Sequence, residues 1–218
     1  MKKDNKKWML GLLLCMMSVF LMIPSQQVQA APVKSKAKNA YAQMLSKKTI
    51  KRDSATVYKR GNCYFAIAYI DKNNIPELII YNTEDASHIQ GWGALYTFRN
   101  GKVQLVGPLM LDNVKRMGYY EKTGWFTDNT TYQGYGGDTI QKLNKGKVME
   151  KVVYHRETFD NGSTVKIKGF AITQSGVYKT VNKTQFNRSL SYNTKNVKFK
   201  KFKFYKNTKA NRIKYLKN

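Results

Sequence analysis

Residues 63–81 read CYFAIAYIDKNNIPELIIY, and this stretch decides the fold class. It contains two runs of apolar, aromatic and β-branched residues, which the polar segment 71–76 separates. Short apolar runs of this composition, bounded by Asp, Asn and Pro, are typical of β-strands joined by a loop. The sequence therefore predicts one strand over Cys63–Ile70 and another over Glu77–Tyr81.

Similar strand-and-turn patterns continue through the rest of the chain. Asn100-Gly101 lies between the apolar segments Ala94–Arg99 and Lys102–Val106, and this dipeptide is the strongest short-range signal for a hairpin. A second hairpin is predicted around Asn144-Lys145-Gly146. The remaining predicted strands cover Met117–Phe126, Thr139–Leu143, Lys147–His155, Thr164–Phe170 and Val197–Tyr205.

Short helices are predicted before and after the strands. Residues 39–46 form the first, because four apolar side chains recur there at helical spacing: Ala40, Tyr41, Met44 and Leu45. Asn182 is expected to cap a helix that carries Phe186 and Leu190, and residues 208–212 open a final helical turn or two. The predicted fold class is α+β, mainly an antiparallel β meander with hairpins, a short N-terminal helix and short C-terminal helices.

The N-terminal residues have the order of a secretory signal peptide. Four lysines precede the apolar run Trp8–Ile23, and the small-residue motif Val28-Gln29-Ala30 follows. Residues 1–30 are therefore predicted to be a signal peptide and residues 31–38 a basic linker. At 16 residues, the apolar run is shorter than the ~20 that span a bilayer. A single domain over 39–218 is expected to be secreted, or bound non-covalently at a Gram-positive-type cell surface, with no transmembrane anchor.

Cysteine usage fits an exported protein without disulfides. Cys15 lies within the predicted signal peptide, so only Cys63 remains after cleavage. Its place in the apolar run that begins at residue 63 predicts a buried, unreactive thiol.

The segment Tyr69–Leu78 resembles the D-x-D-x-[DN]-G-x-P-[DE]-L loop of FG-GAP/VCBS-type β repeats. The resemblance implies that Asp71, Asn73 and Glu77 stand at the third, fifth and ninth positions, whose oxygens surround a calcium ion in such loops. This chain departs from the pattern with a tyrosine at the first position and a lysine inside the loop. The resemblance therefore implies weak calcium binding at most, and a structural β-turn is the alternative.

Several features together resemble exported proteins of clostridial-type Gram-positive bacteria. They are the predicted signal peptide, the short first helix, the apolar strand that ends the 63–81 stretch, and a basic C-terminus. This resemblance implies a location outside the cytoplasm and no particular activity.

Charge is concentrated at one end of the chain. The sequence contains 39 Lys+Arg and 13 Asp+Glu, a formal charge of +26, which excludes an ordinary charge-balanced domain. Its 42% hydrophobic content excludes a disordered basic tail. Cleavage after Ala30 would remove four Lys and one Asp and leave +23, of which +15 lies in residues 161–218, where no Asp or Glu occurs.

Within this basic part, residues 197–205 alternate aromatic and lysine residues. Such alternation predicts a strand with a lysine row on one face, and the pair Lys200-Lys201 predicts a β-bulge before Phe202 and Phe204 return to the buried side. An anionic cell-wall polymer or a sulfated glycan is the expected partner, and no specific nucleic acid is expected. Edge-strand lysines that prevent aggregation are the alternative. The predicted polyanion-binding residues are Lys198, Lys200, Lys201, Lys203, Lys206, Lys209 and Arg212.

Two other functions compete with this non-catalytic binding domain. One is a wall-active or glycan-cleaving enzyme, although common catalytic and nucleotide-binding motifs are absent from the sequence. Its candidate acids are Glu121, Asp128 and Asp138. Rings beside glycines could stack on sugars, and the candidates are Trp92, Trp125 and Tyr135. The other is a secreted structural or interaction module with a vestigial calcium turn.

Overall fold

The computed structural model describes residues 27–51, 57–82, 92–111, 114–132, 135–160 and 165–217. From Val33 onward the chain forms one compact unit. The strands of its two main sheets pair antiparallel, and helices lie at the N-terminal and C-terminal ends of the chain. The predicted α+β class is therefore confirmed.

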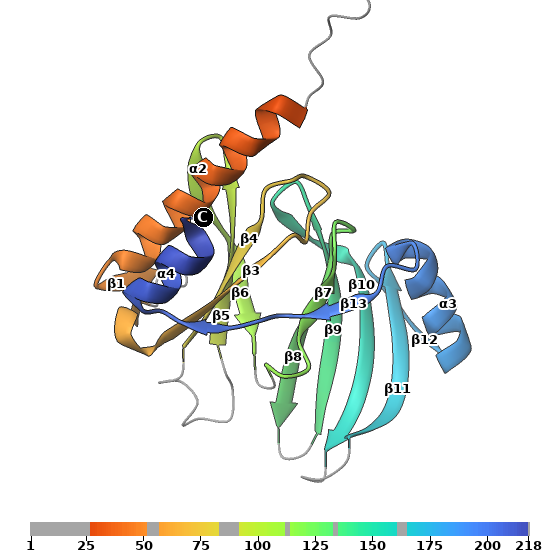
Figure 1. Ribbon diagram of the computed structural model, residues 1–218. Coiled ribbons are helices and arrows are strands. Elements are labelled where there is room, and N and C mark those ends of the chain that lie inside the picture. The colour runs from red at the N-terminus through yellow and green to blue at the C-terminus, as the bar shows by residue number, and fades with distance from the viewer. Residues whose placement is uncertain are drawn as a thin grey trace, which may run out of the picture. The chain divides into compact units, whose positions relative to one another are not determined.

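A five-stranded sheet contains both strands predicted from the 63–81 stretch. Its strand order is β14-β3-β4-β5-β6, so β3 to β6 form a meander and β14 adds an edge from the C-terminal part of the chain (Figure 1). The strands are β3 (Cys63–Ala68), β4 (Glu77–Asn82), β5 (Trp92–Arg99), β6 (Lys102–Met110) and β14 (Tyr205–Lys206).

A seven-stranded sheet follows in the order β12-β11-β10-β9-β8-β7-β13. The single strand predicted over 117–126 is wrong, because the chain turns between β7 and β8, where Lys122 and Gly124 have φ angles of 56° and 88°. Such left-handed residues end a strand. The strands are β7 (Gly118–Tyr120), β8 (Trp125–Tyr132), β9 (Tyr135–Asn144), β10 (Lys147–Asp160), β11 (Val165–Gln174), β12 (Val177–Val181) and β13 (Phe199–Lys201).

The C-terminal helices begin where the sequence predicts. The side chain of Asn182 accepts a hydrogen bond from the Gln185 N–H, and Thr208 caps the last helix in the same way. The remaining elements are α2 (Gln27–Ser46), β1 (Thr49–Lys51), β2 (Val57–Lys59), the 3-10 turn η2 (Arg60–Asn62), α3 (Lys183–Thr194) and α4 (Lys209–Leu216). β1 and β2 pair as a separate two-stranded sheet.

The first helix starts earlier than predicted, so the basic linker predicted over 31–38 is wrong. Residues 31–38 belong to α2, and Ala37 is fully buried. The apolar stripe of α2 begins within this segment and continues at four-residue spacing, with Val33, Ala37, Tyr41 and Leu45 packing on one cluster. The small side chain of Ala37 between lysines gives only a weak hydrophobic signal in the sequence, although it allows close packing.

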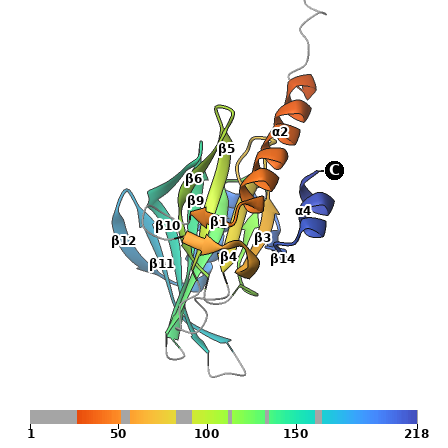
Figure 2. The ribbon, with the colours of Figure 1, turned by 90° about the vertical axis from the view of Figure 1, so that its left-hand side faces the viewer.

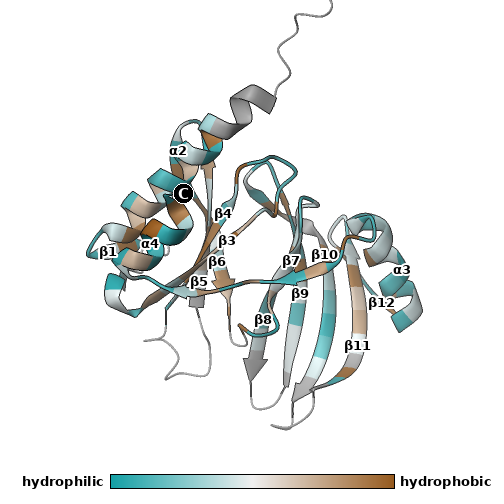
Figure 3. Ribbon diagram, viewed as in Figure 1, coloured by the Kyte–Doolittle hydropathy of each residue, from teal (hydrophilic) through white to brown (hydrophobic). Residues whose placement is uncertain are grey.

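Alternation along the strands of the five-stranded sheet separates two hydrophobic clusters. Cys63 and Phe65 join the cluster shared with α2 and α4, whereas Ala66 and Ala68 join the cluster shared with the seven-stranded sheet. Neighbouring side chains in a strand lie on opposite faces, so both faces of this sheet are covered, and Figure 3 shows brown, hydrophobic segments along its strands. The Cys63 thiol is buried, as predicted, and its Sγ donates to the Lys59 carbonyl at 3.3 Å.

A third cluster lies on the outer face of the seven-stranded sheet. Trp125 and Tyr154 pack there against Phe186 and Leu190 of α3. The compact unit thus has four layers, with α2 and α4 on one side, the two sheets between, and α3 on the other side (Figures 1 and 2).

The segment 198–206, which we call the strap, crosses both sheets at one edge (Figure 1). Its β13 pairs with β7 of one sheet and its β14 with β3 of the other. Between them Phe202 is buried and its N–H donates to the Met117 carbonyl at 3.0 Å. Phe202 and Phe204 are buried and half-buried as predicted. The β-bulge predicted at Lys200-Lys201 is wrong. After Lys201 the chain leaves the seven-stranded sheet, and at Tyr205 it joins the five-stranded sheet.

Candidate anion-binding surface

The strap presents most of its lysines to solvent. Lys198, Lys201, Lys203 and Lys206 are exposed. Lys200 is also exposed, but its Nζ donates to Glu121 Oε2 at 2.5 Å, and this hydrogen bond raises the pKa of Lys200. Within the described residues, Glu121 forms the only ion pair with a strap lysine. The strap therefore keeps a net positive charge.

Two aromatic rings fasten the strap to α4. The rings of Tyr205 and Tyr215 stack with 3.6 Å between their centroids. The Nζ atoms of Lys203 and Lys214 lie over these rings, at 5.8 Å and 5.4 Å from the centroids of Tyr205 and Tyr215 respectively. The C-terminal end of the strap therefore packs against α4, which places the strap lysines and the cations of α4 on connected parts of the fold.

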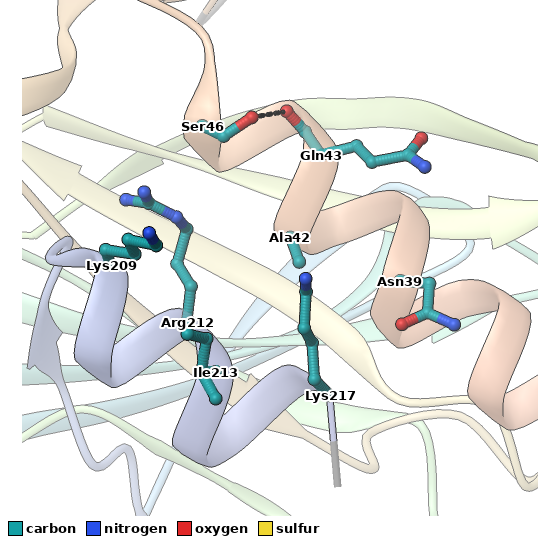
Figure 4. Close-up of a pocket in the computed structure, with 8 residues that line it drawn as sticks. All are labelled: Asn39, Ala42, Gln43, Ser46, Lys209, Arg212, Ile213 and Lys217. Atoms are coloured by element: carbon teal, nitrogen blue, oxygen red, sulfur yellow. Dashed lines mark hydrogen bonds between the residues drawn. The ribbon is translucent and has the colours of Figure 1, made fainter.

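A groove of about 470 Å³ lies between α4 and α2 (Figure 4). It contains Lys209 and Arg212 of the predicted polyanion-binding set, and it adds Lys217, which that set did not include. The opposite wall comes from α2, far away in the sequence, so no local pattern could reveal it. The lining residues are Asn39, Ala42, Gln43, Ser46, Lys209, Arg212, Ile213 and Lys217.

Hydrogen bonds fix the position of Arg212 in this groove. Its Nη1 donates to Asn207 Oδ1 at 2.8 Å and to the Asn207 carbonyl at 3.3 Å. Asn207 is buried, and its Nδ2 donates to the Leu45 carbonyl near the end of α2 at 2.9 Å. Asn207 thus joins the two helices and holds the guanidinium in place.

A second guanidinium lies near the same end of α2. Arg60 Nη1 donates to the carbonyl of Ser46, a residue of the groove, at 2.6 Å. Burial, and then the positive charge of Arg60, lower the pKa of Arg212, although an arginine stays protonated at neutral pH. Among the described residues, neither arginine has a carboxylate partner. Like charges are therefore held together at this end of the groove.

The residues of the calcium-like loop satisfy the loop's own hydrogen-bond donors. Asp71 Oδ2 accepts from Asn73 Nδ2 at 3.2 Å, and Asn73 Oδ1 accepts from the Ile75 N–H at 2.7 Å. Glu77 is fully buried, and its Oε2 accepts from the Ile70 N–H at 2.9 Å. Among the described residues, no group of three or more His, Cys, Asp or Glu side chains is placed to hold a metal ion.

This loop also joins the two main sheets. The N–H of Lys122 donates to the Tyr69 carbonyl at 2.8 Å, and the N–H of Gly124 donates to the Ile70 carbonyl at 2.7 Å. Lys122 Nζ donates to Asn74 Oδ1 at 2.7 Å. These contacts favour a structural turn, and weak calcium binding by Asp71, Asn73 and Glu77 stays an untested prediction.

Two of the candidate catalytic acids lie on opposite faces of one sheet. In the β8–β9 pair, Asn129 is opposite Asp138 and Asp128 is opposite Thr139. Because neighbouring residues alternate between faces, Asp128 and Asp138 point away from each other. Asp138 Oδ1 accepts from Asn129 Nδ2 at 2.6 Å, and Asp128 Oδ2 accepts from Gln141 Nε2 at 2.9 Å. These two acids therefore do not form the carboxylate pair of a glycosidase, and Glu121 is bound to a strap lysine.

The proposed glycan-stacking rings are not available as a group. Trp125 has no exposed surface, because it packs edge-to-face on Tyr154 beneath α3. The expectation that Trp125 stacks on a sugar is therefore wrong. The side chains of Trp92 and Tyr135 lie outside the part of the chain that the structure describes.

No protein-family model, curated protein or solved structure matches this chain. In the described ranges, none of the helices is long and apolar enough to cross a membrane. The site must therefore be interpreted from its own chemistry.

Proposed function

We propose that the protein is an exported, non-catalytic binding domain that engages an anionic surface polymer through its C-terminal basic surface. One observation carries the proposal: residues 161–218 contain 15 Lys+Arg and no Asp or Glu, and they place exposed lysines on the strap and cations in the groove. A basic surface of this kind attracts polyanions over long distances.

Export is supported by where the compact unit begins. That unit starts at Val33, which lies after the predicted cleavage site. Among the residues whose side chains the structure describes, the most N-terminal members of its hydrophobic clusters are Val33 and Ala37. A protein of this type would be secreted or held non-covalently at a Gram-positive-type cell surface.

The residue types favour diffuse contact with a polymer over readout of a defined sequence. Lysines present single, strongly hydrated charges, whereas planar, bidentate recognition is the property of arginine. Every charged side chain of the strap is a lysine. A wall polymer or a sulfated glycan is the proposed partner, and specific nucleic-acid recognition is not part of the proposal.

A second role has its own support. β13 and β14 are edge strands of the two main sheets, and lysines on edge strands prevent pairing with other chains. If the strap lysines served only this purpose, the protein would be a secreted structural or interaction module, and their replacement would promote aggregation without changing polymer binding.

Binding to heparin and to purified cell wall is expected to depend steeply on salt. Raising NaCl from about 0.05 M to about 1 M shortens the Debye length to about 3 Å, so exposed charges no longer attract across the interface. We expect most of the protein to elute over this range in a retention assay. Retention that is unchanged at high salt would contradict an electrostatic surface.

A further inference from the structure

We propose that the groove between α2 and α4 is a discrete subsite that takes one acidic carbohydrate or polyol-phosphate unit of the polymer. The inference rests on the proposed function and names the ligand of the same surface. At about 470 Å³, the groove falls within the ~300–1,000 Å³ of small-molecule sites. A single sugar or a short polyol phosphate is of this size, whereas the polymer extends beyond it.

The α4 wall supplies the charge for an acidic group. Lys209 and Arg212 of this helix line the groove together with Lys217, which directly follows the helix, and Figure 4 shows all three on the side that faces α2. Arg212 is already held by Asn207, so a ligand would meet a guanidinium in a fixed position. Pre-organised donors bind anions with little further loss of conformational entropy.

The α2 wall supplies neutral hydrogen-bonding groups. Asn39 and Gln43 are four residues apart and therefore lie on one face of the helix. Both are exposed, and no described residue hydrogen-bonds to either carboxamide. A carboxamide both donates and accepts, which suits hydroxyl groups better than it suits a bare phosphate.

The groove also contains apolar surface. Ile213 is 43% exposed, and Ala42 lies in the facing wall. The carbon skeleton of a sugar or polyol can lie against such side chains while its hydroxyls reach the carboxamides. Cations, carboxamides and apolar atoms together favour a hydroxylated anion over an inorganic one.

Within the ranges that the structure describes, two of the cations at this groove have structural hydrogen bonds, but two others do not. Arg60 caps the end of α2 by donating to the Ser46 carbonyl, and Arg212 donates to Asn207. No hydrogen bond or ion pair within the described residues engages the Nζ of Lys209 or of Lys217. An anion in the groove would reduce the repulsion among these positive charges.

The test is calorimetric titration of the purified protein with three probes at low salt: a glycerol-phosphate oligomer, a heparin disaccharide and inorganic tripolyphosphate. We expect the two hydroxylated probes to bind at a single site, and their relative affinities separate a wall-type from a sulfated-glycan source. The K209Q/K217Q variant should weaken this binding at least tenfold. This variant keeps the Arg212–Asn207 contact, so the fold should be retained. N39A/Q43A should remove the preference over tripolyphosphate.

The control is a variant of the strap. K201Q/K203Q should keep the affinity for the short probes and lower the retention on long polymer. Short-probe affinity that is unchanged in K209Q/K217Q, or wild-type protein that prefers tripolyphosphate, would overturn the subsite. If long polymer is still retained in that case, the proposed function stands without the subsite. If wild-type protein retains neither short nor long anions, both proposals fail.

Discussion

The Glu77→Gln variant should lack the pH dependence of stability that we expect of the wild-type protein between about pH 4.5 and 8. Glu77 is fully buried, and burial raises its pKa from 4.5 to about 8, although hydrogen bonds from the Ile70 and Asp71 N–H groups favour the ionised form. Within the described part of the chain, its Oε1 has no hydrogen-bond partner. The folded protein therefore holds a proton that the unfolded chain releases.

The sign of the effect follows from this difference in proton binding. Stability from Glu77 is fully present below about pH 4.5 and is lost as pH rises to about 8, by up to about 5 kcal/mol in the free energy of unfolding.

Urea unfolding at pH 5, 6, 7 and 8 measures the slope of the free energy of unfolding against pH. Because Gln does not titrate, the Glu77→Gln variant should show a flatter slope. At pH 8 this variant should also be more stable than the wild-type protein. Asp71→Asn, in the same loop, is the matched control: the Asp71 charge contributes less than burial to the raised pKa of Glu77, so this variant should keep most of the slope. Equal slopes in wild type and Glu77→Gln would contradict this assignment.

The Asp138→Ala variant should destabilise the fold by about 3 kcal/mol, at the low end of the range for broken buried ion pairs. Asp138 is 2% exposed, and its Oδ2 accepts from Arg116 Nη2 at 2.7 Å and from Arg156. Its removal leaves two guanidiniums without this partner and takes an acceptor from Asn129. The arginine side chains are 18% and 31% exposed, so water reduces the loss.

Chemical denaturation at pH 7 measures this change. Glu121→Gln is the control, because it breaks the ion pair with Lys200 at the surface, where such pairs contribute about 0–1 kcal/mol. A loss below about 1 kcal/mol for Asp138→Ala would show that the network around Asp138 does not stabilise the seven-stranded sheet.

Local sequence patterns predicted most of the individual elements. The apolar runs of residues 63–81 became β3 and β4, and the helix caps Asn182 and Thr208 lie where their side-chain chemistry indicates. The errors lie where tertiary packing decides. The start of α2 depends on Ala37 fitting against a distant sheet, and the turn that separates β7 from β8 depends on left-handed residues rather than on hydrophobicity.

The candidate site also combines features that local sequence predicts with features that depend on tertiary packing. The alternation with aromatic residues holds around Lys203, which is exposed between the buried Phe202 and the half-buried Phe204. It does not hold in β13, where Phe199 is exposed along with Lys200 and Lys201. The groove was not predictable, because its walls are the segments 39–46 and 209–217, which meet only in the folded chain. Trp125 was misjudged because the preceding Gly124 indicates a loop, whereas that glycine ends the turn and the ring is covered by α3.

Affinity for an anionic polymer, compared between two variants of equal charge, tests the central claim most directly. One variant replaces four exposed strap lysines with Gln: Lys198, Lys201, Lys203 and Lys206. The other replaces four exposed lysines of β6, β10, β11 and β12: Lys102, Lys147, Lys166 and Lys179.

The two variants lose the same amount of charge at different positions, because β6 and β12 form the sheet edges opposite the strap. We predict that the strap variant loses at least tenfold in affinity for heparin and cell wall while the second variant loses much less. Equal losses in the two variants would show that net charge alone drives binding and would contradict a localised basic surface.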